Sequence, residues 1–394
     1  MGIQDQYDIV VAGSGFCGSV IARLAAECGK RVLVLEKRSH IAGNMYDETD
    51  GDGFLIQRYG PHIFHTDEDW IYEFVSRFSE WTPYQVFYGV ELDGRCIPAP
   101  FGFQAIRMLY SQRDAEELIR RLNACYPDRK SVPVLELMEC PDGMVASFAE
   151  MLYQKNYRPY AAKQWNLAPE ELDRSVVARM PVILSERRNY FDVKYEMLPK
   201  KGYTDFFQRM LCHEKIDVRV NTDVCRFLQF DTVRGVCGKD GEILTVPVVF
   251  TGALEELAGS SGELPYRSLC FEYRTFPQSS YQPMAIVTYP QEHKYLRTTE
   301  FSKLMPKPLA GKTVVAFEYP VPYSRGSDQG GEPYYPILAP RNMAKHEEYL
   351  AKLHRIENVY PCGRLADYRY YNMDQAIIRA FDVFRLIKTK HWDP

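Results

Sequence analysis

The first apolar runs of the chain predict a strand, a helix and a second strand. Residues 7–12 and 32–35 are short, continuous apolar runs, whereas residues 16–28 carry apolar side chains at helical spacing. Gly29 separates the helix from the second strand. Two buried strands joined by a helix are typical of a βαβ unit in a parallel sheet.

Further patterns predict more elements of both kinds. Runs rich in β-branched and aromatic residues, separated by Pro and Gly, predict an antiparallel sheet, and residues 248–251 suit a return to the first sheet. The expected elements are helices at 115–122, 144–153 and 373–389, and strands at 248–251, 266–276 and 313–319.

These elements predict an α/β fold of three parts. The first is a discontinuous Rossmann-type FAD-binding domain, the second a helical insertion domain and the third an antiparallel β-sheet domain. Their expected boundaries are 1–80, 200–262 and 355–394 for the first, 101–199 for the second, and 81–100 with 263–354 for the third.

Composition narrows the class of protein. The 394 residues are 46% hydrophobic and 25% charged, which fits a globular protein of about two or three domains. A net charge of −4 provides no basic field, so we do not expect nucleic acid as a partner. No run approaches the ~20 apolar residues of a membrane span, and no signal peptide is recognisable. Ten cysteines without metal-ligand spacing suggest reduced thiols, no metal site and a cytoplasmic location.

A glycine fingerprint lies between the first strand and helix. Gly13, Gly15 and Gly18 fit G-x-G-x-x-G, in which a tight turn brings the backbone close to a pyrophosphate at a helix N-terminus. Glu36 ends the second strand, where an acid accepts hydrogen bonds from ribose hydroxyls. The alternative is an ordinary turn followed by a surface glutamate. The complete context favours dinucleotide binding.

Two further segments favour FAD over NAD. The basic cluster beginning at Lys37, followed by Gly43 and Asn44, resembles the segment by which many FAD enzymes hold the diphosphate and ribose. Gly363 and Arg364 precede a helix starting near Met373, as in the closing flavin contact of the same enzymes.

Motifs along almost the whole chain resemble the UDP-galactopyranose mutase family. They are YGPHIFHT at 59–66, KQW at 163–165, RMPV at 179–182, NYF at 189–191, EPYYP at 332–336 and GRL at 363–365. The resemblance implies a redox-neutral interconversion of the pyranose and furanose forms of a nucleotide-diphosphate sugar. UDP-galactose, the precursor of galactofuranose in cell-surface glycans, or a related sugar would be the substrate.

The family chemistry requires FAD in its reduced form. Flavin N5 attacks the anomeric carbon and expels the nucleotide diphosphate, and the adduct opens to an iminium. The ring then closes through another hydroxyl, and the diphosphate returns to the anomeric carbon and releases the flavin. An external reductant such as NAD(P)H is implied. Because bacterial relatives are commonly dimers, the resemblance also implies a homodimer.

The resemblance assigns catalytic roles to His62, Arg179 and Arg297. The two arginines match diphosphate-binding positions, for which an always-charged, bidentate guanidinium is suited, and His62 would lie beside the flavin. An ordinary surface salt bridge and a structural histidine are the alternatives.

Aromatic residues complete the implied substrate site. Tyr160 would stack on the nucleotide base with Trp165 nearby, and Tyr190, Tyr335 and Tyr370 match tyrosines that contact the diphosphate. A buried phenol donates a hydrogen bond while its ring packs against apolar groups. Ordinary core packing is the alternative.

Four positions depart from the family pattern near the sugar. Gly102, Ala161, Val287 and Asn372 stand where the family commonly has Asn, Thr, Asn and Asp. Because a site built for a hydroxyl disfavours a ligand without it, a trimmed pocket would suit a deoxysugar or another substituent. The alternative is drift within a UDP-galactose enzyme, with water filling the gaps.

Two other functions compete with the mutase. A redox flavoprotein of the amine oxidase-like class shares the N-terminal fingerprint, and would consume oxygen with an amine substrate. A mutase-derived protein without activity would bind nucleotide but never modify the flavin.

Overall fold

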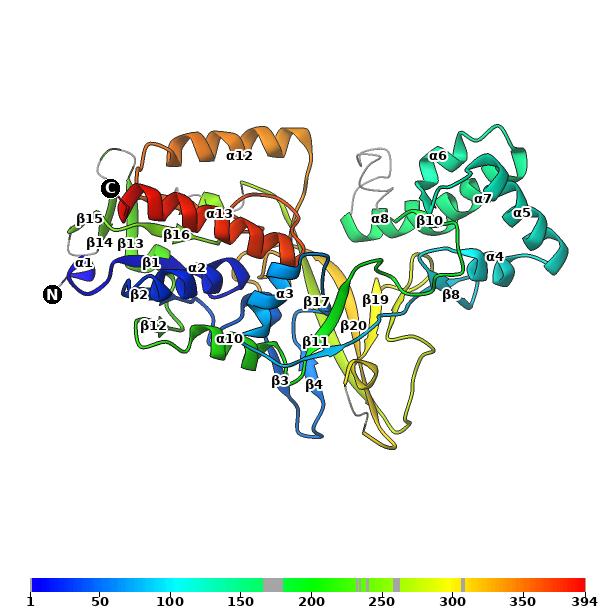
Figure 1. The fold of residues 1–394 in the computed structure, drawn as a ribbon, viewed down its shortest axis with the longest axis horizontal. Helices are drawn as coiled ribbons and strands as arrows, with labels where there is room; N and C mark the ends of the chain where they lie inside the picture. The colour runs from blue at the N-terminus through cyan, green and yellow to red at the C-terminus, as the bar shows by residue number, and fades with distance from the viewer. Residues whose placement is uncertain are drawn as a thin grey trace.

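The computed structural model describes residues 2–165, 180–231, 233, 235–238, 241–257, 263–305 and 309–393. Figure 1 shows a parallel sheet with its helices at one end, a large sheet in the middle and a helical region at the other end. Both chain termini lie beside the parallel sheet. No helix in these ranges has the length and apolar character needed to cross a membrane.

The parallel sheet is the frame of the first part. Its strands are, in order, β12 (Ile216–Arg219), β2 (Val32–Leu35), β1 (Ile9–Ala12), β16 (Val248–Phe250) and β22 (Val359–Pro361), and every neighbouring pair is parallel. The strands β1, β2 and β16 are fully buried, which explains their continuous apolar runs.

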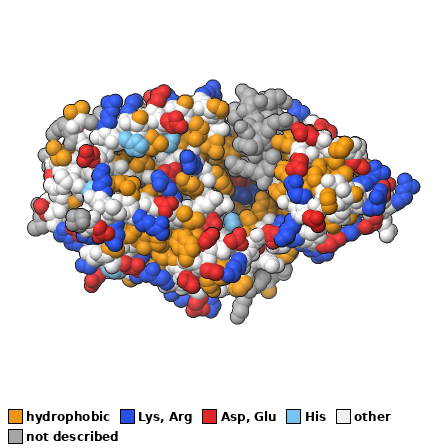
Figure 2. All heavy atoms as spheres, turned by 45° about the horizontal axis from the view of Figure 1, so that its top comes forward, with side chains coloured by type: hydrophobic (Ala, Val, Ile, Leu, Met, Phe, Trp, Pro, Cys, Tyr) orange, Lys and Arg blue, Asp and Glu red, His pale blue; other side chains and the backbone are white. Residues whose placement is uncertain are grey.

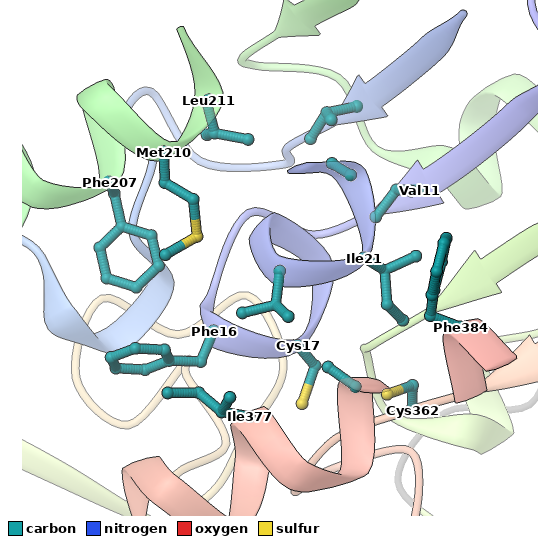
Figure 3. Packing of buried hydrophobic residues seen from close by; sticks show 14 of the residues in the cluster. Val11, Phe16, Cys17, Ile21, Phe207, Met210, Leu211, Cys362, Ile377 and Phe384 are labelled. Carbon is teal, nitrogen blue, oxygen red and sulfur yellow. The ribbon is translucent and has the colours of Figure 1, made fainter. Parts of the chain in front are cut away.

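Alternate side chains of these strands enter two separate cores. Ile9 and Val11 pack with helices α2 (Phe16–Glu27), α10 (Tyr203–Leu211) and α13 (Met373–His391). Val10 and Ala12 pack on the opposite face, together with α12 (Pro340–Leu353) and the β13–β15 sheet. Figure 3 shows α2 held between α10 and α13 through Phe16, Ile21, Phe207 and Ile377. Because successive side chains of a strand point to opposite faces, Ile9 and Val11 form the surface on which helix α2 packs. This packing also positions the glycine turn that precedes the helix.

A seven-stranded sheet forms the centre of the molecule. Its order is β21 (Tyr335–Pro336), β17 (Tyr266–Phe276), β20 (Thr313–Pro322), β19 (Arg297–Glu300), β18 (Ile286–Thr288), β7 (Tyr88–Leu92) and β8 (Arg95–Ala99). All pairs are antiparallel except β18 with β7. The expectation of an antiparallel sheet therefore needs this one correction, because β7 and β18 are distant in sequence and no tight hairpin fixes their direction.

The helical region follows β8. It contains α4 (Phe103–Leu109), α5 (Gln112–Cys125), α6 (Val134–Met138), α7 (Gly143–Leu152), η2 (Tyr153–Tyr157) and α8 (Arg158–Trp165), with the short pair β9 (Ser131–Val132) and β10 (Val182–Ile183). Ser111 and Asp142 cap α5 and α7 by accepting backbone N–H groups of the first turn. These helices share one hydrophobic core, which also includes Val90 and Leu92 of β7 and Ile97 and Ala99 of β8.

The remaining elements connect these parts. A small sheet consists of β5 (Phe64–Thr66), β11 (Tyr195–Pro199) and β6 (Trp81–Pro83), and β5 is the end of the YGPHIFHT segment. The others are α1 (Ile3–Gln6), η1 (Gly43–Met45), β3 (Asp47–Thr49), β4 (Leu55–Gln57), α3 (Asp69–Ser76), α11 (Val224–Phe227), β13 (Leu228–Asp231), β14 (Gly235–Gly238), β15 (Ile243–Leu244), η4 (Leu254–Glu256) and η5 (Phe301–Leu304).

The elements expected from the sequence are present with small shifts at their ends. The strand expected at 7–12 begins at Ile9, because the Tyr7 N–H closes the short helix α1 by donating to the Ile3 carbonyl at 2.9 Å. The strand expected at 266–276 matches β17, and the helix expected at 373–389 is two residues longer. The domain boundaries stay a prediction, and α12, expected in the sheet domain, packs with the parallel sheet.

Candidate functional site

A pocket opens at the carboxyl ends of β1, β2 and β16, where open α/β sheets bind their ligands. It brings together ten of the predicted cofactor residues: Gly13, Gly15, Gly18, Glu36, Lys37, Gly43, Asn44, Gly363, Arg364 and Met373. These residues come from both ends of the chain and meet around the first turn of α2.

The glycine turn leaves no room for side chains at two of its positions. Gly13 has φ +103°, and a Cβ there would lie 2.0 Å from Thr251 Oγ1. A Cβ on Gly18 would lie 1.9 Å from the Gly13 carbonyl oxygen. Gly15, in contrast, lines the pocket, and a Cβ there would lie 3.9 Å from Gly43 Cα, an ordinary contact. The turn is thus folded for close approach of a ligand to the backbone at the N-terminus of α2.

Glu36 is buried at the edge of this pocket. Its Oε2 accepts from the Ser14 N–H at 2.9 Å and from Ser14 Oγ at 2.6 Å, and its Oε1 accepts from the Arg38 N–H at 2.9 Å. A carboxylate offers about four lone-pair sites. The described residues therefore leave one site on Oε1 unused, and its contact with a ribose hydroxyl stays a prediction.

Arg38 adds a positive charge that the sequence analysis did not single out. Its Nη2 donates to Asn44 Oδ1 at 3.0 Å and to Glu332 Oε2 at 2.6 Å, and its guanidinium lies 4.4 Å from the centre of the Tyr59 ring. Burial opposes the charge, but Glu332 keeps the pKa of Arg38 raised. Its buried Nε makes no hydrogen bond to the described residues. The one feature of the sequence that pointed to Arg38 was its place in the basic cluster that begins at Lys37.

A second group of residues, the arginine–tyrosine cluster, lies where the large sheet meets helix α8 and two loops. It consists of Arg297, Glu318, Tyr88, Tyr160, Tyr190, Tyr335 and Tyr370. Arg297 on β19 lies directly opposite Glu318 on β20, and its Nε and Nη2 donate to Glu318 Oε2 at 3.0 and 2.5 Å. The two side chains are 17% and 5% exposed, so this is a largely buried ion pair.

Three phenols surround the Arg297 guanidinium. Tyr88, Tyr160 and Tyr335 interact with it electrostatically. Burial opposes the Arg297 charge, while Glu318 and these phenols hold the pKa of Arg297 well above its ordinary value. Burial also raises the pKa of Tyr160, and raises the pKa of Tyr335 to about 12. The cluster therefore holds a fixed cation among protonated phenols that can donate hydrogen bonds.

Arg364 joins the pocket to the cluster. It lines the pocket, and its guanidinium lies 5.4 Å from the Tyr335 ring centre and 4.9 Å from that of Tyr370. The rings of Tyr335 and Tyr370 stack at 5.9 Å, and Trp165 meets Tyr335 edge-on at 6.4 Å. Figure 2 shows the surface hollowed between the larger body and the helical region.

His62 lies near Arg364 and Arg297 but does not line the pocket. Burial, with the charges of Arg364 and Arg297, lowers the pKa of His62 to about 3, so the imidazole is neutral at pH 7. Its Nδ1 is buried and makes no hydrogen bond to the described residues. Its backbone is fixed, because its N–H donates to Gln57 Oε1 at 2.6 Å. A contact of His62 with the cofactor stays a prediction.

Arg179, the other predicted diphosphate ligand, lies outside the described residues. Tyr190 is placed in the cluster by its ring, which lies 4.2 Å from that of Tyr88. Tyr88 and Glu318 are members that the sequence analysis missed. Glu318 had one signal, since it is the single charged residue in the apolar run 313–319. Tyr88 had none, because only the pairing of β7 with β18 brings it here.

The four departures from the family pattern do not lie together. Val287 pairs with Thr298, one residue from Arg297, so its side chain emerges on the opposite face of the sheet. Ala161 is buried in the core of the helical region. A Cβ on Gly102 would lie 3.0 Å from the Ser185 carbonyl oxygen, so a side chain there would require a small shift of its neighbour. Asn372 alone lines the pocket, where it caps α13.

The described residues contain no group of three or more side chains suited to hold a metal ion. All ten cysteines are free.

Comparison with known proteins identifies the family. The family model for UDP-galactopyranose mutase matches residues 155–370, and that for an NAD(P)-binding Rossmann-like domain matches residues 11–78. The chain is 34% identical to UDP-galactopyranose mutase of Mycoplasma pneumoniae, over 95% of each chain. It is 31% identical to dTDP-fucopyranose mutase of Escherichia coli, over 96% of this chain and 97% of that one. Its fold resembles that of reduced UDP-galactopyranose mutase, with a TM-score of 0.70, 17% identity and coverage of 97% and 96%. The chain therefore belongs to the UDP-galactopyranose mutase family of isomerases.

Proposed function

We propose that this protein interconverts the pyranose and furanose forms of a nucleotide-diphosphate sugar, with FAD in its reduced form as cofactor. One observation carries the proposal: Arg364 joins a dinucleotide pocket to a buried cluster of one arginine and several phenols. A redox enzyme of the amine oxidase-like class has no evident need for such an anion site beside its cofactor.

The pocket residues fit FAD. The glycine turn would accept the diphosphate, Glu36 has a lone pair left for a ribose hydroxyl, and Arg38 has a buried Nε without a partner. When bound and reduced, FAD would supply an electron-rich nitrogen as the nucleophile for the anomeric carbon.

Arg297 would stabilise the diphosphate as it leaves the sugar. Glu318 orients the guanidinium from one side, which leaves its remaining N–H groups for phosphate oxygens. The phenols of Tyr160 and Tyr335 keep their protons and can donate to the same anion. We propose Arg179 as a second cation and Tyr190 and Tyr370 as further contacts.

The neutral His62 would serve a different purpose. A neutral imidazole adds no third positive charge beside Arg364 and Arg297, and it can donate or accept one hydrogen bond at Nδ1, according to its tautomer. We propose that it contacts the reacting end of the cofactor. Burial of these groups would also protect an opened sugar chain from water.

The sugar has two candidates. Relatives named UDP-galactopyranose mutase and dTDP-fucopyranose mutase match the chain at similar identity. Val287 lies on the sheet face away from Arg297, and Ala161 lies in the core of the helical region. Asn372 is the one departure at the pocket.

A trapping experiment tests the proposal. The protein is reduced anaerobically, mixed with UDP-galactose, dTDP-fucose or a control nucleotide sugar, and treated with cyanoborohydride. The mass of the released flavin should increase by that of one sugar, and the preferred substrate should give the largest yield. An unchanged flavin in reduced protein that binds nucleotide would favour an inactive relative. Oxygen consumption with an amine would favour the redox class.

A further inference from the structure

Lys163 connects the helical region to the large sheet. It lies on α8, and its Nζ donates to the carbonyl oxygens of Tyr289, Gln291 and His293, the last two at 3.3 and 2.7 Å. These carbonyls belong to the loop of residues 289–296, which links β18 to β19. Three carbonyls in one loop thus converge on a single ammonium group.

The match between donor and acceptors is complete. An ammonium group has three N–H donors and no acceptor, and here each donor has its own carbonyl. Lys163 is half-buried, and burial lowers its pKa while Glu91 opposes the shift. Removing the ammonium would leave three carbonyls of this loop without that partner.

A second cation holds the same helix at the neighbouring residue. Arg267 on β17 is buried, and its Nε donates to the Gln164 carbonyl oxygen at 2.8 Å. Gln164 is in the last turn of α8, where carbonyls have no partner within the helix. The end of α8 is therefore fastened to the sheet at two neighbouring residues.

The two structures that are joined carry opposite sides of the arginine–tyrosine cluster. Helix α8 carries Tyr160 and Trp165, and the loop leads directly to Arg297. Figure 1 shows α8 at the side of the helical region nearest the rest of the chain. The position of Tyr160 relative to Arg297 depends on this junction.

We propose that Lys163 is a positioning residue for nucleotide binding, which fixes the helix bearing Tyr160 at its working distance from Arg297. This inference rests on the proposed function, in which these two side chains hold the base and the diphosphate. A cleft with its walls already in place loses less conformational freedom when the nucleotide binds.

Lys155 provides a matched control. It lies on η2 in the same region and forms an ion pair with Asp93, but the two side chains are 42% and 48% exposed. Exposed pairs of this kind contribute little. Lys155→Met therefore makes the same chemical change without breaking the junction.

The test compares Lys163→Met with Lys155→Met in FAD-loaded protein. Hydrogen exchange should become faster in Lys163→Met at residues 158–165 and 289–296, and stay unchanged there in Lys155→Met. Affinity for UDP and dTDP should fall by about tenfold or more in Lys163→Met, with KM raised more than kcat is lowered. FAD content should stay the same in both variants.

Two results would overturn the proposal: unchanged exchange in Lys163→Met, or nucleotide affinity within about twofold of the parent protein. If the parent protein binds no nucleoside diphosphate, the proposed function fails, whereas the exchange comparison still decides the junction. Should Lys163→Met not fold, Lys163→Arg replaces it. Its planar fork cannot serve three converging carbonyls in the same way, so exchange and affinity should be intermediate; values equal to the parent's would refute the role.

Discussion

The cofactor pocket and the arginine–tyrosine cluster are built in different ways. The centre of the pocket is local: the glycine turn, the N-terminus of α2 and a glutamate at a strand end lie within residues 13–44, and later segments of the chain complete the lining. The cluster is made of side chains from β7, α8, β19, β20, β21 and two loops, which the sheet register and the packing of α8 bring together. A local site tolerates changes elsewhere in the chain, whereas an assembled site depends on each junction.

The largest effect is expected at Arg297. Arg297→Met removes the cation of the cluster, and kcat/KM should fall by about 10²–10³, as when a charge-stabilising donor is removed elsewhere. FAD should stay bound, because Arg297 does not line the pocket. Steady-state kinetics measure kcat/KM, and flavin absorbance measures the bound FAD.

Arg297→Met also leaves Glu318 buried without its partner, at a cost of about 3–5 kcal/mol. Arg297→Lys separates this loss of stability from the loss of chemistry, since it keeps a charge opposite Glu318 but not the planar fork. Full activity in Arg297→Lys would show that charge alone suffices, and full activity in Arg297→Met would remove the cluster from the mechanism.

Gly18→Ala should weaken FAD binding more than nucleotide binding, which is the reverse of the effect expected for Arg297→Met. The new methyl would lie 1.9 Å from the Gly13 carbonyl oxygen, and the resulting strain of about 1–3 kcal/mol should weaken FAD binding by roughly 10- to 100-fold. Nucleoside diphosphate affinity should change less. Gly51→Ala is the control, because a Cβ there meets nothing within 4 Å. Equal FAD affinity in both variants would mean that the turn adapts.

The difference between a local site and an assembled site also explains which residues could be predicted from the sequence. Gly13, Gly18 and Glu36 were predictable because their requirements are local, and each is visible in the spacing of a few residues. Tyr88 was not, since nothing near it in sequence marks a site and its place depends on a parallel pairing with β18. Val287 shows the limit of motif alignment: a shift of one residue in a strand moves a side chain to the other face.

His62, between the two sites, should give the folded protein a measurable pH dependence. Its pKa is lowered from 6.5 to about 3 by burial and by Arg364 and Arg297. The unfolded chain therefore binds a proton that the folded chain excludes, so stability should fall as pH drops from 6.5 towards 3. This histidine alone should contribute a slope of about 1.4 kcal/mol per pH unit within that window.

Comparison with His62→Gln isolates that contribution from the carboxylates. Denaturant unfolding of the two proteins at several pH values should show a shallower loss of stability in the variant below pH 6.5. Parallel curves for the two proteins would mean that His62 is protonated or exposed in the folded state, and its placement between the arginines would then be wrong.

The smallest effect is expected at Val287, and it tests the register on which the cluster depends. Val287→Thr keeps the shape of the side chain but buries a hydroxyl, so stability should fall by about 1–3 kcal/mol. KM for the nucleotide sugar should change by less than about twofold, because the side chain emerges on the face away from Arg297. A large change in KM or in sugar preference would place residue 287 on the substrate side of the sheet. Val287 and its partner Thr298 share one face of the sheet, whereas Arg297, the neighbour of Thr298, and Glu318 share the other. If residue 287 faced the cleft, Arg297 and Glu318 would therefore point away from it.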